Sequence, residues 1–445
     1  MLPKKTSLTL LTFAALVLTL NLAKVARPIA TGAVVEFRPR ASPAVDVTPH
    51  PTATATPTRS AITTPDLIDE HENLNAFYRA LWRTESKQPG AVTRVLHYGD
   101  SPVTADSITA DVRSLLQEHY GDAGHGFILI AKPWAWYGHR GVDVLGKGWR
   151  IEAATQSRAA DRLHGLGGVS FQGTPGAASQ LVLQEDHARM EVQYLRQPGG
   201  GELEVRGEGR TIAAIETAGA APEAAFQTVE LPAGTRVIDL VVERGPVRLF
   251  GVSFERDQPG VIYNSLGLNG GQVQSIVRYF DVPQWTIELQ HEKPDLVVLN
   301  YGTNESIYAD YIEKYYSGEL REVIRRVKTA VPNASVLVMS PMDRGQRDGS
   351  GQITTVPALP RLVEIQREIA GEMGCAFFNT FQAMGGEGTM ARWYESQPRL
   401  VSADFTHPLP GGARKVGVLL DEALEAGYRG YQRQAAQRSA DGAKP

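Results

Sequence analysis

Residues 92–101 read VTRVLHYGDS, an apolar run that ends in a Gly-Asp-Ser turn. The run has the length of a short strand, and residues 105–119, just beyond the turn, carry apolar side chains at helical spacing on one face. A strand, a tight turn and a helix in this order open an α/β unit. The stretch therefore predicts an α/β fold with Ser101 at the end of its first strand.

The same alternation of strands and helices returns in the second half of the chain. Short apolar runs typical of buried strands occur at 260–266, 295–300, 335–340 and 376–379. Segments with helical periodicity lie between or after them, at 272–280, 311–330, 359–373 and 411–426. Alternation of this kind predicts a parallel sheet covered by helices on both faces.

The pattern changes between residues 148 and 258. Short runs of alternating polarity, such as 190–194 and 237–242, are separated by Gly and Pro turns, and helical periodicity is scarce. Several short strands at close intervals are typical of a β-sandwich. We therefore expect a β-domain inserted into the α/β domain.

The N-terminus has the pattern of an export signal. Lys4 and Lys5 precede an uncharged apolar run at 8–23, which indicates a signal peptide or an N-terminal membrane anchor within residues 1–26. Residues 27–65 are rich in Pro, Thr and Ala and predict a disordered linker. The rest of the chain is expected to be extracytoplasmic: periplasmic, secreted, or held at the inner membrane and facing outward. The predicted parts are two hydrolase segments at 66–147 and 259–430, the insert at 148–258, and a disordered tail at 431–445.

Charge and residue usage exclude several other classes. The chain has 45 Lys and Arg against 49 Asp and Glu, a net charge of -4, which argues against a general nucleic-acid binder. A single cysteine, Cys375, cannot form an intramolecular disulfide. The ten histidines show no metal-ligand spacing with Cys or acidic partners. We therefore expect neither a metal nor another cofactor.

Four short segments lie at the ends of the predicted elements, where an open α/β sheet places its site. They are Gly99-Asp100-Ser101, Gly270 within LGLNGG, Gly302-Thr303-Asn304, and Asp404-Phe405-Thr406-His407. Taken together and in this order, they resemble the signature of the SGNH (GDSL) hydrolase family. The resemblance covers about 92–120 and 260–426. It implies a three-layer α/β/α parallel sheet, into which the β-sandwich would be inserted.

The resemblance also implies a role for each matching residue. Ser101 would be the nucleophile, His407 its general base, and Asp404 the residue that orients the imidazole. The oxyanion of the tetrahedral intermediate would be bound by the backbone amides of Ser101 and Gly270 and by the side chain of Asn304. Gly267 and Gly271 are neighbouring alternatives for the glycine.

The segment 96–144 is similar to that of bacterial extracytoplasmic SGNH proteins that carry an inserted carbohydrate-binding-module-like domain, peptidoglycan O-acetylesterases among them. Pro102 departs from these relatives, which often have a polar residue after the serine. Trp134, Trp136 and Tyr137 form an aromatic cluster near the first block. Aromatic faces pack on sugar rings, so the cluster could line a glycan cleft. The alternative is that it fills the junction between the two domains.

The leading hypothesis is an exported serine esterase that hydrolyses O-acetyl esters of a cell-wall or extracellular polysaccharide through an acyl-Ser101 intermediate. Its partner would be the acetylated glycan. One alternative is an O-acetyltransferase with the same triad, which would differ only in excluding water from the intermediate. Another is a non-catalytic glycan-binding protein with a degenerate site.

Overall fold

The computed structural model describes residues 66–442. The predicted signal peptide or anchor at 1–26 and the linker at 27–65 lie outside these residues. No helix within the described part of the chain is long and apolar enough to cross a membrane.

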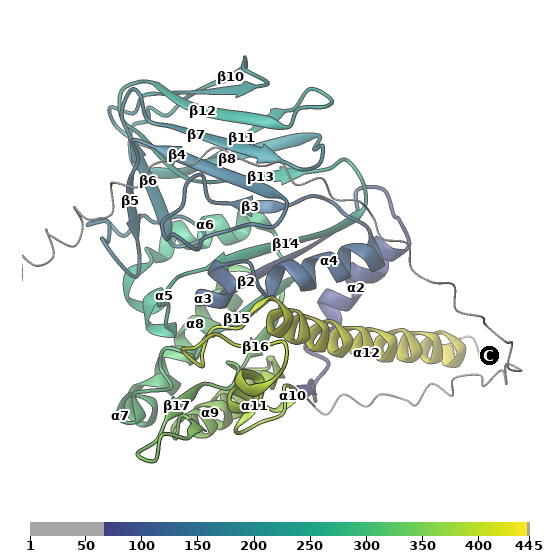
Figure 1. Ribbon diagram of the computed structural model, residues 1–445. Coiled ribbons are helices and arrows are strands. Elements are labelled where there is room, and N and C mark those ends of the chain that lie inside the picture. Colours follow the sequence, from purple (N-terminus) through teal and green to yellow (C-terminus); the bar gives the residue numbers. More distant parts are fainter. Residues whose placement is uncertain (1–65, 443–445) are drawn as a thin grey trace, which may run out of the picture. The chain divides into compact units, whose positions relative to one another are not determined.

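A six-stranded sheet forms the centre of the α/β part (Figure 1). Its strand order is β1 (Leu67–Ile68), β19 (Ala376–Phe378), β16 (Ser335–Met339), β15 (Leu296–Asn300), β2 (Val92–Gly99) and β14 (Gly260–Gly267). All neighbours pair in parallel except β1, which is antiparallel to β19 at the edge. The parallel strands end at a common edge, which is where the predicted site residues lie.

Helices cover both faces of this sheet because its strands are apolar on both sides. In β15, Leu296 and Val298 belong to one core cluster, whereas Val297 and Leu299 belong to the other. The first cluster is completed by α2 (Asn75–Glu85), α4 (Thr109–Tyr120) and α12 (Pro410–Gly442). The second is completed by α5 (Val273–Tyr279), α6 (Val282–Glu292), α8 (Ser317–Ala330) and α9 (Leu359–Glu372). The predicted three-layer α/β/α arrangement is therefore confirmed.

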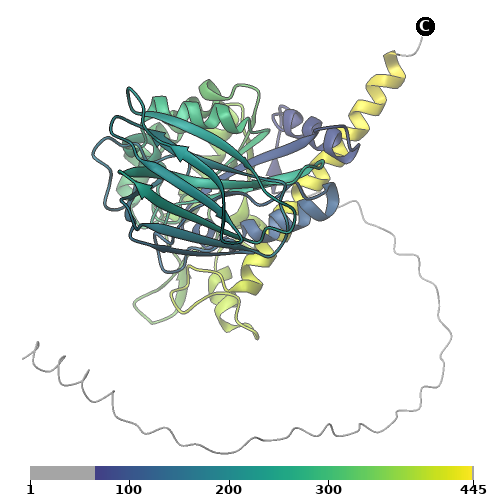
Figure 2. The ribbon, with the colours of Figure 1, turned by 90° about the horizontal axis from the view of Figure 1, so that it is seen from above.

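Two antiparallel sheets form the β-rich part, which both views show as a stack of strands (Figures 1 and 2). One has the order β10 (Arg210–Glu216), β9 (Glu202–Gly207), β12 (Val237–Arg244), β7 (Ala178–Leu183) and β4 (Val142–Lys147). The other has the order β11 (Glu223–Glu230), β8 (Arg189–Arg196), β13 (Val247–Glu255), β6 (Val169–Gly173) and β5 (Arg150–Ala153), and β3 (Gly126–Ile128) also pairs with β13. Strands β3 and β4 precede residue 148, so the β-rich part begins earlier in the chain than predicted.

The C-terminal segment differs from the prediction. Residues 431–442 were expected to be disordered, but α12 continues to Gly442 and extends beyond the neighbouring helices (Figure 2). The segment YQRQAAQRSADG is polar, and polarity alone suggested disorder. Its Ala, Gln and Arg residues are nevertheless good helix formers. They extend a helix whose first turns are already packed, so the cost of nucleation does not arise again.

The remaining helices and strands are short. They are α3 (Ser101–Thr104), α7 (Ala309–Tyr311), a π-helical turn (Ile312–Tyr316), β17 (Gly345–Arg347), β18 (Ile353–Thr355), α10 (Thr380–Ala383) and α11 (Thr389–Glu395). β17 and β18 form a hairpin, and this hairpin and α3 both lie next to the candidate site.

Candidate active site

Ser101 stands where β2 ends and α3 begins. A Cβ on Gly99 would lie 2.5 Å from Cγ2 of Val103 and 3.0 Å from the carbonyl oxygen of Asn300, so the tight turn requires glycine there. Ser101 is the first residue of α3, and its backbone N–H has no partner among the described residues. An N–H at a helix start lacks an intrahelical acceptor and is available to an anion.

Three predicted residues form a continuous hydrogen-bonded chain. The hydroxyl Oγ of Ser101 lies 2.8 Å from Nε2 of His407, and Nδ1 of the same ring lies 2.6 Å from Oδ2 of Asp404. If Nδ1–H donates to the carboxylate, Nε2 is left as an acceptor for the serine proton. This is the arrangement that a general base needs beside a nucleophilic hydroxyl.

The carboxylate of Asp404 is held in its charged form. Partial burial by itself would raise its pKa, but hydrogen bonds from the Ser402 hydroxyl, the His407 backbone and ring, and the Thr406 backbone keep the pKa well below its ordinary value. Asp404 therefore stays ionised at neutral pH, and it can stabilise an imidazolium at His407.

Gly270 is the glycine of the second block whose N–H is free. The N–H of Gly271 donates to the carbonyl of Leu268 at 2.8 Å, and Gly267 lies within β14 in register with Gly99. Gly270 has a φ of +68°, and its N–H has no partner among the described residues. Nδ2 of Asn304 donates one hydrogen bond, of 2.9 Å, to the carbonyl of Gly271, so the two predicted oxyanion loops are joined. A second Nδ2–H remains for a ligand.

Two buried carboxyl groups behind the site were missed by the sequence analysis. Glu305 is fully buried, its Oε1 accepts a 2.8 Å hydrogen bond from the N–H of Val273, and burial raises its pKa to about 8. Asp100 is also buried, which raises its pKa to about 6, although Thr303 and His407 oppose the shift. Asp100 and Glu305 each stand next to a predicted site residue in the sequence. Only their burial in the folded protein shows that their pKa values are raised.

The aromatic cluster does not stay together. Trp134 and Tyr137 are buried in the apolar core, and the Tyr137 hydroxyl accepts a 2.8 Å hydrogen bond from the N–H of Leu129. Trp136 is 54% exposed. Trp134 and most of Tyr137 therefore fill the core, as in the alternative in which the aromatic side chains pack between the domains. Of the three rings, that of Trp136 is the one open to a ligand.

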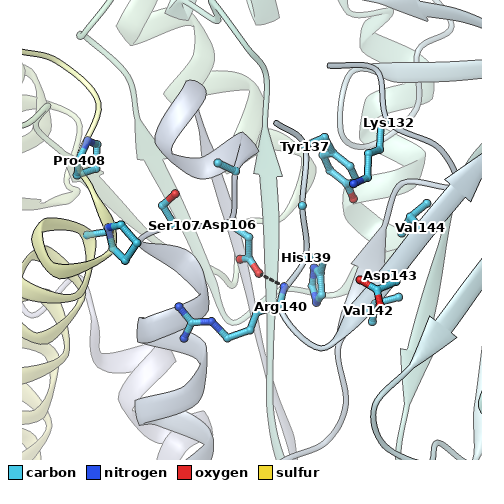
Figure 3. A pocket seen from close by; sticks show the side chains of 14 residues that line it. Asp106, Ser107, Lys132, Tyr137, His139, Arg140, Val142, Asp143, Val144 and Pro408 are labelled. Atoms are coloured by element: carbon cyan, nitrogen blue, oxygen red, sulfur yellow. Dashed lines mark hydrogen bonds between the residues drawn. The ribbon is translucent and has the colours of Figure 1, made fainter. Parts of the chain in front are cut away.

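A pocket of about 390 Å³ adjoins the loop that carries Asp404 and His407 (Figure 3). It lies between Pro408, which follows His407, the turn at Asp106, and β4 of the β-rich part. Asp106 accepts a 2.8 Å hydrogen bond from the backbone N–H of Arg140, which fixes the wall between them. Lys132, Tyr137 and Asp143 also line the pocket, so it offers polar groups and part of an aromatic ring. Among the described residues, no group of three His, Cys, Asp or Glu could hold a metal ion.

Residues 233–415 match the sequence model of the GDSL-like Lipase/Acylhydrolase family. This segment of the chain is therefore similar to that family. The matched range includes Gly270, Asn304, Asp404 and His407. Ser101 lies outside it, because it precedes the inserted strands in the chain. No curated protein matches the chain.

One solved structure shares the fold of this chain, and two further structures match it more weakly. A structure titled "Peptidoglycan O-acetylesterase in action, 5 min" has a TM-score of 0.69 and 21% identity, and the match covers 80% of this chain and 96% of that one. An acetyl xylan esterase, AlAXEase, matches at 19% identity over 37% of this chain and 80% of its own, with a TM-score of 0.28. A family two carbohydrate esterase from Clostridium thermocellum matches at 10% identity over 58% and 95%, with a TM-score of 0.26. The first match confirms the predicted α/β fold with a β-rich insert. The match of residues 233–415 to the GDSL-like family agrees with the predicted SGNH-type esterase.

Proposed function

We propose that the protein is an exported serine esterase that removes O-acetyl groups from a cell-wall or extracellular polysaccharide. The observation that carries this proposal is the hydrogen-bonded chain from Ser101 through His407 to Asp404. A serine hydroxyl is a weak nucleophile until a positioned base accepts its proton, and this chain supplies the base and its orienting carboxylate.

The reaction would proceed in two halves. As Ser101 Oγ attacks the acetyl carbon, His407 Nε2 takes the hydroxyl proton and the carbonyl oxygen becomes an oxyanion. The N–H groups of Ser101 and Gly270 and the side-chain amide of Asn304 would stabilise that oxyanion. The intermediate collapses to acetyl-Ser101, and the sugar oxygen leaves with the proton from His407. A water molecule, deprotonated by His407, then releases acetate and restores Ser101.

The exposure of the base supports hydrolysis rather than transfer to a second sugar. The side chains of His407 and Asp404 are 47% and 51% exposed, so water reaches the acyl-enzyme readily. A transferase would have to exclude water from this position. The ordered hydrogen bonds of all three residues also speak against a degenerate site that only binds glycans.

The choice of a glycan ester rests on two observations. The structural relative with the 0.69 TM-score is named a peptidoglycan O-acetylesterase. The pocket beside Pro408 adds a polar depression next to the acyl site, bordered by β4 of the β-rich insert. Export and inner-membrane anchorage rest on the pattern of residues 1–26 alone.

Acetate release tests the proposal directly. The purified full chain should release acetate from p-nitrophenyl acetate and from an O-acetylated glycan. Ser101→Ala should lower both rates by about three to six orders of magnitude without unfolding the protein. Ser114→Ala, on the exposed side of α4, is the matched control and should retain both rates. Equal rates in the wild type and Ser101→Ala would disprove the mechanism, and ester hydrolysis without glycan deacetylation would disprove the substrate class.

A further inference from the structure

Two loops supply donors of the predicted oxyanion hole, and two side chains join them. Asn304 donates from Nδ2 to the carbonyl of Gly271 at 2.9 Å. The next residue, Glu305, accepts at Oε1 a 2.8 Å hydrogen bond from the N–H of Val273. Two consecutive residues of one loop therefore bind two backbone groups of the other. Gly270, whose N–H has no partner among the described residues, directly precedes these groups.

The contact to Val273 lies at the start of a helix. Val273 is the first residue of α5, so its N–H has no acceptor within the helix and depends on Glu305. A Cβ at Gly270 would meet no atom within 4 Å, which means that packing does not hold this glycine in place. The direction of the Gly270 N–H is therefore set by the turn that follows it, and Asn304 and Glu305 anchor that turn.

Glu305 is well placed to act as such an anchor. Its side chain is fully buried, and Val273 is 1% exposed. A hydrogen bond in these surroundings is stronger than one in water. Without the carboxyl group, the N–H of Val273 would be buried with no acceptor. The other carboxyl oxygen of Glu305, Oε2, has no hydrogen-bond partner among the described residues, so Oε1 alone makes the contact.

We propose that Glu305 is a positioning residue of ester hydrolysis, which fixes the start of α5 against the oxyanion loop (residues 302–305). The N–H of Gly270 and the side chain of Asn304 are thereby aimed at the same oxyanion. Because it is fully buried, Glu305 acts through Gly270 and does not touch the substrate. A displacement of about 1 Å at such a donor can cost about 100-fold in rate. This inference rests on the proposed esterase function and adds a residue on which its reaction depends.

The carboxyl group makes this contact without a charge at neutral pH, because burial raises the pKa of Glu305 to about 8. The titratable groups that face it are Asp100, Tyr301, Tyr311 and Tyr316. Asp100 has a pKa of about 6, and burial raises the pKa values of the three tyrosines above their ordinary 10. Between pH 7.5 and 9.5, Glu305 is therefore the member of this group whose charge changes most.

Truncation and conservative replacement of Glu305 separate alignment from stability. Glu305→Ala should lower kcat for p-nitrophenyl acetate at pH 7.5 by about 10- to 100-fold, because the donors of the oxyanion hole lose their alignment. KM should change by less than about threefold, since the contact matters in the transition state. Glu305→Gln keeps an oxygen for the N–H of Val273 and should retain kcat within about threefold of the wild type.

Glu292→Ala is the matched control. Glu292 is also a buried carboxyl group, and its Oε1 accepts a 2.7 Å hydrogen bond from Nε2 of Gln193. It ends α6, four residues before β15 begins, whereas the predicted site residues follow the ends of the parallel strands. Its removal should lower the melting temperature and leave kcat within about threefold of the wild type.

The pH profile of kcat gives a readout that a purely structural role would not change. From pH 7.5 to 9.5 the wild type should lose about 10-fold in kcat as Glu305 releases its proton, because a buried negative charge behind the hole opposes the oxyanion. Glu305→Gln has no such proton and should keep its rate. Rates of Ser101→Ala, subtracted at each pH, remove spontaneous hydrolysis, and tryptophan fluorescence checks the fold. This comparison remains decisive if Glu305→Ala does not fold.

The outcomes separate this inference from the proposed function. A folded Glu305→Ala with the kcat of the wild type would overturn the positioning role and leave the esterase intact. So would a Glu305→Gln variant as slow as Glu305→Ala, or parallel pH profiles for the wild type and Glu305→Gln. No Ser101-dependent release of acetate by the wild type would instead overturn the proposed function itself.

Discussion

Replacement of Glu305 by Gln probes the electrostatics behind the oxyanion loop. Glu305 is fully buried, and burial raises its pKa from the ordinary 4.5 to about 8, so its carboxyl group is protonated at neutral pH. Gln has nearly the same shape as a protonated Glu and keeps an oxygen to accept the N–H of Val273, which lies 2.8 Å from Oε1. The substitution therefore removes the titration and preserves the contact.

The magnitude follows from the difference in pKa between the folded and unfolded states. Between pH 4.5 and about 8 the folded wild type retains a proton on Glu305 that the unfolded chain has released. The wild type therefore loses stability as pH rises, by about 1.4 kcal/mol per pH unit. Glu305→Gln has no such loss. From pH 5.5 to 7.5 the variant should gain about 3 kcal/mol in free energy of unfolding relative to the wild type.

Urea unfolding followed by tryptophan fluorescence, at pH 5.5, 6.5 and 7.5, measures this difference. Glu395→Gln, on the exposed side of α11, is the control and should show a difference that does not change with pH. Glu305→Ala removes the acceptor for Val273 and should lower stability by about 1–3 kcal/mol beyond the cost of the cavity. A difference between Glu305→Gln and the wild type that is constant across the three pH values would refute the reasoning, because Glu305 would then be ionised in the folded protein.

Three further predictions concern the site and its surroundings. Asn304→Ala should lower kcat for p-nitrophenyl acetate by about two to three orders of magnitude, and a loss below threefold would remove Asn304 from the oxyanion hole. Trp136→Ala should weaken glycan binding without lowering the melting temperature, because its ring is exposed. Trp134→Ala, at a buried ring, should lower the melting temperature. The reverse pattern would contradict the burial of these two rings. Burial lowers the pKa of His139 to about 3. Below pH 6.5 the unfolded chain therefore binds a proton at His139, whereas the folded protein leaves this imidazole neutral until the pH approaches 3. On lowering the pH from 7.5 to 5.0, wild type should therefore lose about 2 kcal/mol more stability in urea titrations than His139→Gln, and equal losses would show that His139 titrates normally.

Local patterns in the chain were enough to predict most of the fold and the chemistry of its centre. Strand and helix periodicity identifies the parallel strands, because a strand buried on both faces must be apolar throughout, as β15 is. The pair Asp404 and His407 is also a local feature. They are three positions apart, and one short loop brings Nδ1 of His407 to 2.6 Å from the carboxylate of Asp404. Gly99, two residues before Ser101, is only partly a local requirement, because a Cβ there would meet Val103 in the same turn and also the carbonyl of Asn300 on β15.

Other features depend on residues that are far apart in the chain. Ser101 and His407 are separated by 306 positions and meet because β2 and the later strands end at one edge of the sheet. Their meeting could be expected only through the resemblance to a known family. The division of the aromatic cluster and the protonation of Glu305 carried no signal in the sequence. Burial and pKa depend on what surrounds a side chain, and those surroundings come from several segments that only the folded chain brings together.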